Sequence, residues 1–234
     1  MSYGLKVLST NDTVQIDSDN SNKVIYQLSS TGTVSIPSRA SLGLGYDSRN
    51  YCFASKTDSS INSNYSLIFV KPSSTPVGQS TFAEPGSGSF TLYSSLESTS
   101  YKYYVFNPTA SGTTNIVTAP STGDYGLVVY DTDGTTLKYS SAVSALRVKS
   151  VITNSGSYSG TGLIALQQRK YSEVKPAALT PIKAFAWVTT FNSNSIFHGK
   201  GLWFIGTTGT GATEDAEYLE LGAAVTTIIA ATEV

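Results

Sequence analysis

Histidine and cysteine, the residue types on which most catalytic and metal sites depend, occur once each in this chain, as His198 and Cys52. A hydrolytic triad needs a base beside its Ser or Cys nucleophile, and zinc sites need several imidazole or thiolate ligands. His198 stands between two apolar runs, where we expect a hairpin turn. Cys52 stands in an apolar strand, where we expect it to be buried. These counts exclude an intrachain disulfide and an imidazole or thiolate metal cluster.

Carboxylates are the one type of catalytic group that occurs as a cluster in this sequence. Glu214, Asp215, Glu217 and Glu220 are closely spaced, and a pair of carboxylates can cleave a glycosidic bond. A polysaccharide-cleaving enzyme is therefore one hypothesis. Such dense spacing is also typical of a solvated acidic loop, which is the interpretation we favour. We predict no catalytic, cofactor-binding or metal-binding residue and no cofactor.

Two glycine-containing segments begin like ligand-binding loops without completing them. Residues 131–134, Asp-Thr-Asp-Gly, start like a calcium loop, but Ser140 stands where such a loop needs its acidic ligand. Residues 206–211 are rich in glycine like a phosphate loop, but no Lys-Ser/Thr pair follows them. We interpret both segments as hairpin turns.

Aromatic side chains offer a different chemistry, because their flat faces can stack on sugar rings. Strand-borne aromatics more often fill a core, so a carbohydrate groove is an alternative to core packing here. The candidate stacking residues are Tyr3, Tyr46, Tyr101, Tyr103, Tyr104, Trp187 and Trp203.

Composition limits the partners that the chain can have. Charged residues make up 13% of the 234 residues and the net charge is −1, so nucleic-acid binding by phosphate neutralisation is not expected. The first residues show no signal peptide, and the apolar stretch 222–231 is shorter than the roughly 20 residues that a membrane span needs. We expect assembly in a host cytoplasm without membrane insertion.

Short apolar runs separated by Gly, Pro, Asn, Ser and Thr predict an all-β fold. We expect an antiparallel β-sandwich or barrel, between which the sequence does not decide. No segment has a sustained helical period, and only short turns such as residues 94–98 could be helical. The expected strands are 5–8, 13–17, 24–28, 33–36, 51–54, 65–70, 89–93, 101–107, 126–130, 137–140, 145–152, 162–168, 184–191, 201–205 and 218–221.

Residues 2–18 recur as residues 124–140. At an offset of 122, seven aligned pairs are identical: Tyr, Gly, Leu, Val, two Thr and Ser. Each copy reads as an alternating strand, a two-residue Asn-Asp or Asp-Gly turn, and a returning strand, which predicts a β-hairpin. Because residues 109–123 are rich in Gly, Ser, Thr and Pro, we divide the chain into β domains at 1–120 and 121–234.

Three further segments carry specific expectations. Residues 71–89, with several Pro and Gly, predict a long surface loop suited to contacts. Strand 101–107 has aromatic residues on both faces, so we expect it to be covered on both sides, by a second sheet or another subunit. In strand 145–152, Leu146, Val148 and Ser150 alternate with Arg147, Lys149 and Val151, the pattern of a half-buried strand.

The opening residues Met-Ser-Tyr-Gly-Leu-Lys-Val, followed by a polar turn and a strand ending in Ile16-Asp17-Ser18, resemble the N-terminus of a family of small tail-associated virion proteins of tailed bacteriophages. The likeness covers about twenty residues and recurs in the copy near residue 124. Family members continue with an acidic-basic pair, where this chain has residues 19–23, Asp-Asn-Ser-Asn-Lys. The resemblance implies a tail, tail-tip or fibre-associated position and supplies no enzymatic residues.

These observations lead to a first hypothesis, a non-enzymatic structural protein of a bacteriophage virion. It would be homo-oligomeric, contact other tail proteins through β-rich interfaces, and use its N-terminal hairpin for attachment. A capsid decoration protein is a variant of the same hypothesis. The alternative is a host-attachment module that binds a host-surface glycan through residues 71–89.

Overall fold

The computed structural model describes residues 6–8, 14–17, 26–42, 51–75, 78–108, 128–130, 137–140, 146–153, 155–167, 173–177, 180–206 and 226–231. Most of these residues are in strands, and the only helical turn among them is a short 3-10 helix, η1 (Ala40–Leu42). Residues 94–98, the end of a strand and the bend after it, contain no helical turn. The all-β prediction is confirmed.

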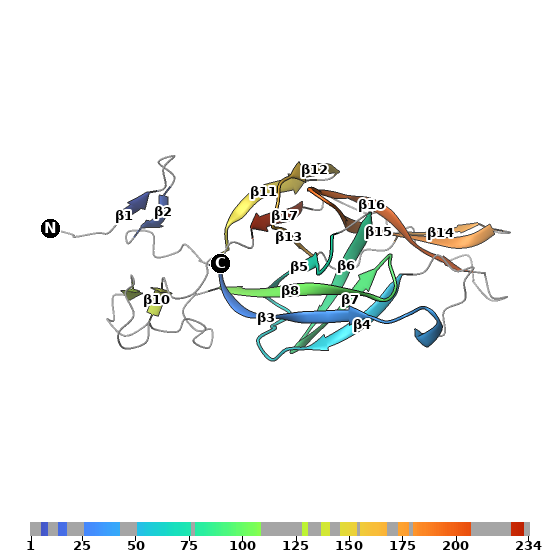
Figure 1. Cartoon of the computed structure of the whole chain (residues 1–234), viewed down its shortest axis with the longest axis horizontal. Coiled ribbons are helices and arrows are strands. Elements are labelled where there is room, and N and C mark those ends of the chain that lie inside the picture. Colours follow the sequence, from blue (N-terminus) through green and yellow to red (C-terminus); the bar gives the residue numbers. More distant parts are fainter. Residues whose placement is uncertain are drawn as a thin grey trace.

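Most strands belong to two antiparallel sheets, which we name sheet I and sheet II (Figure 1). Sheet I has the spatial order β11 (Val148–Thr153), β17 (Thr226–Ala231), β13 (Leu163–Leu166), β5 (Leu67–Pro72), β8 (Thr99–Pro108) and β3 (Tyr26–Ile36). Sheet II has the order β12 (Gly156–Ser159), β16 (Ser195–Gly206), β15 (Thr180–Asn192), β6 (Gln79–Gly86), β7 (Ser89–Ser94) and β4 (Cys52–Thr57), and β14 (Glu173–Ala177) also pairs with β15.

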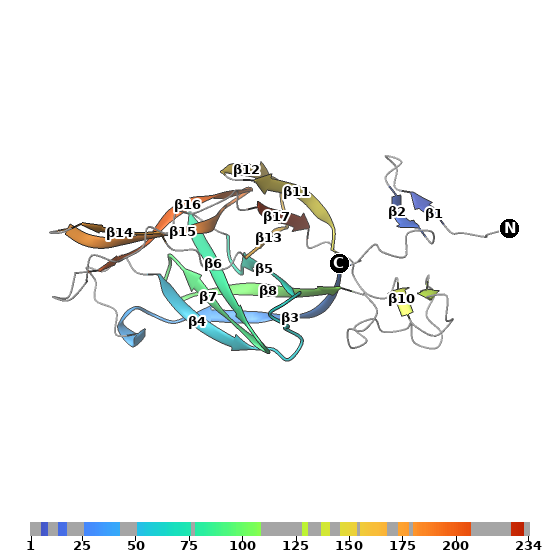
Figure 2. The ribbon, with the colours of Figure 1, turned by 180° about the vertical axis from the view of Figure 1, so that it is seen from behind.

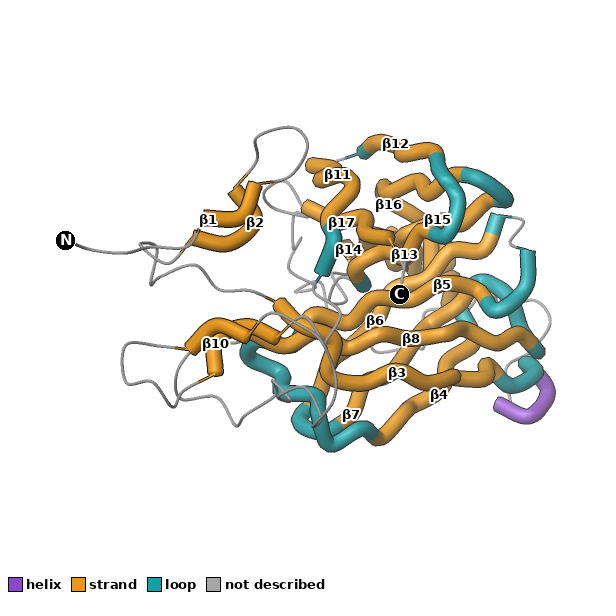
Figure 3. Tube along the Cα trace, turned by 60° about the vertical axis from the view of Figure 1, so that its left-hand side comes forward, coloured by secondary structure: helices purple, strands orange, loops and turns teal. Residues whose placement is uncertain are grey.

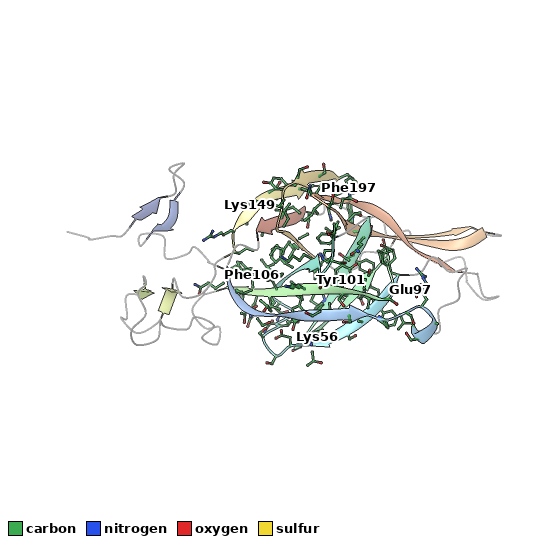
Figure 4. All side chains as sticks on the ribbon, viewed as in Figure 1. Lys56, Glu97, Tyr101, Phe106, Lys149 and Phe197 are labelled. Atoms are coloured by element: carbon green, nitrogen blue, oxygen red, sulfur yellow. The ribbon has the colours of Figure 1, made fainter. Side chains whose placement is uncertain are left out.

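The main core lies between these sheets. Sheet I contributes Tyr101 and Val105 of β8, and sheet II contributes Phe90 and Leu92 of β7, all at most 1% exposed. Figure 4 shows Tyr101 among the side chains that fill the space between the sheets. No hydrogen-bonded ladder joins the two sheets among the described strands. The architecture is therefore a sandwich, the first of the two alternatives left open by the sequence.

Strand β8 carries apolar side chains on both faces, as the sequence predicted. Tyr101 and Val105 face the core between the sheets, whereas Phe106 is buried in a separate cluster with Phe69 of β5 and Ile164 of β13. Successive side chains of a strand point to opposite faces. Sheet I is therefore packed on its outer face as well.

Both copies of the repeat form antiparallel hairpins outside the two sheets. Strand β1 (Lys6–Leu8) pairs with β2 (Val14–Asp17), and β9 (Val128–Tyr130) pairs with β10 (Leu137–Ser140). Figures 1 and 2 show both hairpins at the same end of the sandwich from opposite sides. The predicted hairpins are confirmed, and their turn residues lie outside the described residues.

Strands from both halves of the chain share each large sheet. β5 pairs with β13 in sheet I, and β6 pairs with β15 in sheet II. The division at residue 120 is thus not confirmed by the pairing of the described strands. The predicted linker 109–123 lies outside them, so the division stays a prediction.

Two predicted loops are strands in the structure. The segment 71–89 contains β6, which pairs with β7 and β15 in the middle of sheet II. Its Pro85 and Gly86 lie at the end of the strand next to the tight β6–β7 turn, where Gly88 has a φ of 67°. This position explains how a strand can contain them, because Pro and Gly weaken the interior of a strand more than its end.

The hairpin turn predicted at His198 lies instead at residues 193–194, between β15 and β16. His198 is a fully buried residue of β16 and stacks on Trp187 of β15, with ring centroids 5.4 Å apart. The neighbouring Gly199 is a strand residue: a Cβ there would lie 2.7 Å from the ring of Phe197. Glycine at this position makes room for an aromatic ring and does not mark a turn.

Strand β11 at the edge of sheet I is more exposed than predicted. Val148 is 50% exposed and Val151 is 57% exposed, whereas Ile152 is buried. Only β17 pairs with β11 among the described strands, so one side of β11 has no ladder partner within that part of the chain. The predicted burial of Val148 is therefore wrong. Because β11 lies at the edge of sheet I, fewer neighbouring side chains cover it than cover an interior strand.

Candidate functional site: duplicated hairpins and a two-lysine pocket

The two hairpins match residue by residue in their pairing. In the first, Leu8 faces Val14 and Val7 faces Ile16, which leaves Gln15 as an extra residue. In the second, Tyr130 faces Leu137 and Val129 faces Tyr139, which leaves Lys138 as the extra residue. Each hairpin therefore has a bulge at the same place in its second strand.

This structural match corrects the alignment of the repeat. The first strands correspond at an offset of 122, but β2 and β10 correspond at 123, because 14 pairs with 8 and 137 pairs with 130. The connection 131–136 is thus one residue longer than the connection 9–13. At the corrected offset, Val14 matches Leu137 and Ile16 matches Tyr139, so the apolar alternation of both strands agrees.

Both hairpins join the sandwich at one corner. The chain enters β3 at Tyr26 after the first hairpin, and it leaves β8 at Pro108 before the second hairpin. Tyr26 and Pro108 face each other in the β3–β8 ladder. After the second hairpin the chain returns at Leu146, whose backbone N–H donates to the Tyr26 carbonyl oxygen at 2.8 Å. The tube in Figure 3 shows both hairpins beside this end of sheet I.

A pocket of about 270 Å³ lies between sheet I and the turns of sheet II, toward the other end of β8. Three connections surround it: the segment after β5, the β12–β13 turn and the β15–β16 turn. No acidic residue is among the described residues that line it. Its polar lining consists of Lys71, Lys102, Ser73, Asn192, Ser193 and Ser195.

The two lysines of this pocket face each other across neighbouring strands. Lys71 of β5 and Lys102 of β8 are direct partners in the antiparallel ladder. Lys71 is half-buried, and its Nζ lies 5.9 Å from the ring centroid of Tyr104, within reach of a cation–π contact. Burial and the positive charge of Lys102 lower the pKa of Lys71.

Backbone hydrogen bonds hold the connections around the pocket together. The Gly160 N–H donates to the Asn194 carbonyl at 2.9 Å, which ties the β12–β13 turn to the β15–β16 turn. The Gly78 N–H donates to Asn192 Oδ1 at 3.1 Å, and the Ser73 N–H donates to the Ser100 carbonyl at 2.9 Å. The pocket is thus built into the fold on three sides.

A second group of polar side chains surrounds Asp58, between β4 and β5. Oδ1 of Asp58 accepts from the backbone N–H of Ser60 at 3.0 Å and from the Ser60 hydroxyl at 2.6 Å. Oδ2 accepts from the hydroxyls of Ser30 and Tyr103, the latter at 3.1 Å. We name these four residues the Asp58 cluster.

Hydrogen bonds favour the ionised form of Asp58 in this cluster. Partial burial opposes ionisation of Asp58, but the bonds from Ser30, Ser60 and Tyr103 outweigh it and lower the pKa of the carboxyl. Burial, followed by the bond to the Asp58 charge, raises the pKa of Tyr103 to about 12. In this cluster a neutral phenol thus donates a hydrogen bond to an ionised carboxylate, an arrangement that stabilises the fold.

The acidic residues singled out in the sequence do not enter a described site. Glu214, Asp215, Glu217 and Glu220 lie outside the described residues, as do Asp131 and Asp133. Among the described residues no group of three or more His, Cys, Asp or Glu could hold a metal ion. Cys52 is buried, as predicted. Within the same part of the chain, no helix is long and apolar enough to cross a membrane.

Most of the described stacking candidates are core residues. Tyr101, Tyr103 and Trp187 are at most 6% exposed and Tyr104 is half-buried, so these residues do not form an open sugar platform. The side chain of Trp203 and the residues Tyr3 and Tyr46 lie outside the description.

A row of aromatic side chains lies on the outer face of sheet II and was not predicted from the sequence. Phe82 of β6 stacks on Tyr93 of β7 at 4.6 Å, and Phe53 of β4 lies 5.8 Å from Tyr93. Phe53 is 40% exposed and Phe82 is buried. The register of three strands creates this row, so no local spacing in the sequence signals it.

No protein-family model, curated protein or solved structure was found to match this chain. The class that its own fold and surfaces define is an antiparallel β-sandwich with two equivalent hairpins at one end and a basic pocket toward the other.

Proposed function

We propose that this chain is a non-enzymatic structural component of a bacteriophage virion, associated with the tail, tail tip or fibre, and that its two hairpins hold it in the particle. The observation that carries the proposal is the duplication. The same hairpin, with the same bulge, occurs twice and joins the sandwich at one corner. Among the described strands, neither hairpin pairs with the large sheets.

Two equal hairpins suit a partner with repeated sites. Particles of this kind are built from rings of identical subunits, in which each binding surface recurs by rotation. A chain with one attachment element contacts one such surface, whereas a chain with two equivalent elements can contact two neighbouring copies. Linking two contacts in one chain strengthens attachment without a new type of interface.

Other observations support the same class of protein. The opening residues resemble small phage tail proteins, and the composition is neutral and rich in hydroxyl side chains. The edge strand β11 exposes Val148 and Val151, which suits β-rich contacts between subunits. A position on the capsid would fit these features equally, and imaging of intact particles would separate the two positions.

Assembly of particles with altered hairpins tests the proposal. Deletion of residues 1–18 should abolish incorporation of the chain. Val7→Asp and Val129→Asp, which change equivalent positions of the two hairpins, should each reduce incorporation to a similar degree. The matched control is Lys102→Gln, an exposed position on the interior strand β8 of sheet I toward the end away from the hairpins, which should assemble normally.

Incorporation is measured by the amount of the chain in purified particles, and circular dichroism of each purified variant checks that the sandwich is folded. Normal incorporation of the deletion variant would contradict the proposal. A defect in Val7→Asp without one in Val129→Asp would show that the two hairpins are not equivalent.

A further inference from the structure

The outer apolar layer of sheet I extends to the edge strand β11. Val151 faces Ile228 in the β11–β17 ladder, and Val148 faces Ala230. Ile228 and Ala230 belong to the apolar cluster on the outer face of the sheet. Because residues directly opposite each other in a ladder share a face, both valines lie on the outer face as well. The layer is therefore buried on the interior strands and open to water at β11.

The two edge strands of sheet I differ in what they expose. Val151 is 57% exposed and Val148 is 50% exposed, which makes them the two most exposed large hydrophobic side chains among the described residues. On β3, the opposite edge, the exposed residues are Thr31, Thr33 and Ser35. Figures 1 and 2 show β11 and β3 at opposite margins of the sandwich. An apolar edge strand is a template for pairing with another chain, so β11 is the edge that suits a partner strand.

The residues of β11 complement themselves when two copies run antiparallel. If Val151 faces Val151 of a second copy, Lys149 faces Thr153 and Ser150 faces Ile152. Two β-branched apolar side chains then meet at the centre, and such cross-strand pairs stabilise a sheet. No two lysines face each other in this register, whereas a register centred on Lys149 would place like charges opposite each other. Apolar pattern and charge thus both favour the register centred on Val151.

The same pairing joins the apolar layers of the two copies. Ile152 is buried in the core between the sheets, and Val151 points to the opposite face. A two-fold axis perpendicular to the sheet places the outer faces of both copies on the same side. The outer layer of one copy therefore continues into that of the other. An isologous contact of this kind uses one edge from each copy and closes after two copies.

We propose that a second copy of this chain binds along β11, with Val151 facing Val151 across a two-fold axis and the two six-stranded sheets joined into one. This pairing specifies the β-rich contact between subunits in the function proposed above, on which it rests in that respect. The hairpins take no part in it. Dimerisation is measured with the purified full chain and incorporation is measured in particles, so the failure of one proposal is seen separately from the failure of the other.

Sedimentation velocity of the purified full chain tests for the dimer. We expect a reversible dimer whose fraction rises with concentration. Val151→Asp places two carboxylates face to face and should raise the dissociation constant by about tenfold or more. Val151→Ile keeps a β-branched apolar side chain and should dimerise at least as well as the parent chain.

The matched control for the charged variant is Thr33→Asp, an exposed position on the opposite edge strand β3. It should dimerise like the parent chain. Val151 is an exposed edge residue, so Val151→Asp should fold, and circular dichroism of each variant checks this.

An introduced cysteine locates the two-fold axis. Cys52 is the only cysteine of the chain and is buried, so a disulfide between copies reports the introduced thiol. In the proposed register the Cα atoms of the two residues 151 lie about 5 Å apart, within the range of a disulfide. Those of the two residues 153 lie more than about 13 Å apart, because four residues of strand separate them. Val151→Cys should therefore link the copies under mild oxidation, and Thr153→Cys should not.

Three results would overturn the proposal. The first is a chain that stays monomeric at every concentration. The second is a dimer that Val151→Asp does not weaken. The third is linking of Thr153→Cys copies as readily as Val151→Cys copies, which would mean that the two-fold axis does not pass through Val151.

Discussion

The Asp58 cluster and the Lys71–Lys102 pair place charge in the same sandwich in opposite ways. The carboxylate of Asp58 accepts four hydrogen bonds from Ser30, Ser60 and Tyr103. The two lysines face each other instead, with no acid among the described residues of their pocket. Adjacent residues of β8 serve the two arrangements, because Tyr103 reaches Asp58 and Lys102 reaches the pocket.

The difference separates a charge that supports the fold from a pair of like charges that opposes it. A charge that the fold satisfies completely stabilises the fold and has little capacity left for a ligand. Two like charges that face each other across a ladder cost stability. Substitutions should therefore change stability in opposite directions at the two places.

The largest effect is expected at the carboxylate. Asp58→Ala removes the acceptor of four hydrogen bonds and leaves their donors partly buried, which should lower the free energy of unfolding by about 3 kcal/mol. Urea denaturation measures the change. Ser55→Ala, an exposed strand position bonded to Thr91, is the control and should change stability by less than about 0.5 kcal/mol. Equal losses of unfolding free energy in the two variants would mean that the Asp58 cluster stabilises the fold no more than an exposed hydrogen bond does.

The next largest effect is expected at Gly32 of β3, which lies under the ring of Tyr103. A Cβ at Gly32 would lie 2.6 Å from the Tyr103 hydroxyl oxygen, so Gly32→Ala should displace the ring from Asp58 and cost about 2 kcal/mol. Thermal denaturation measures this. Gly160→Ala is the matched control, because its nearest contact would be an ordinary 3.4 Å to Leu163. A similar loss in both variants would contradict the argument.

Acid should remove the contribution of Asp58. The hydrogen bonds lower the pKa of this carboxyl in the folded chain, so its stabilisation is complete above the unfolded value of about 3.9 and is lost as the pH falls through the folded value. The stability difference between the parent chain and Asp58→Asn should therefore shrink below about pH 4. Urea titrations at several pH values test this, and a difference that grows with acid would contradict it.

The smallest effect, of opposite sign, is expected at the pocket. Lys102→Gln should raise the free energy of unfolding by a few tenths of a kcal/mol, because it removes the like charge facing Lys71. Added salt should stabilise the parent chain more than this variant, since salt screens the repulsion. Chemical denaturation at low and high salt measures both effects. A loss of stability in Lys102→Gln would show that this lysine supports the fold.

Local patterns predicted the hairpins well. Alternating apolar residues and turn-forming residues lie within a few positions of each other, and the strands β1, β2, β9 and β10 fall within one or two residues of their expected places. A constant offset of 122 nevertheless misaligned the second strands. The extra residue lies in the connection 131–136, and only the pairing of Tyr130 with Leu137 locates it.

The remaining features could not be predicted, because they depend on contacts between strands that are far apart in the sequence. The sequence places β6 among Pro and Gly residues that suggest a loop, and its partner β15 lies about a hundred residues later. The pocket could not be predicted for the same reason, since Lys71 and Lys102 meet only through the register of β5 and β8. The hydrogen bond from Tyr103 to Asp58 likewise depends on where Gly32 falls in the ladder.

The shared corner of the two hairpins has a consequence for limited proteolysis. The first hairpin connects to the sandwich through residues 18–25, so one cut in that segment separates it from the sandwich. The second hairpin is continuous with the sandwich on both sides, through Pro108 and Leu146. One cut on either side leaves it tethered, so a protease must cut twice to release it.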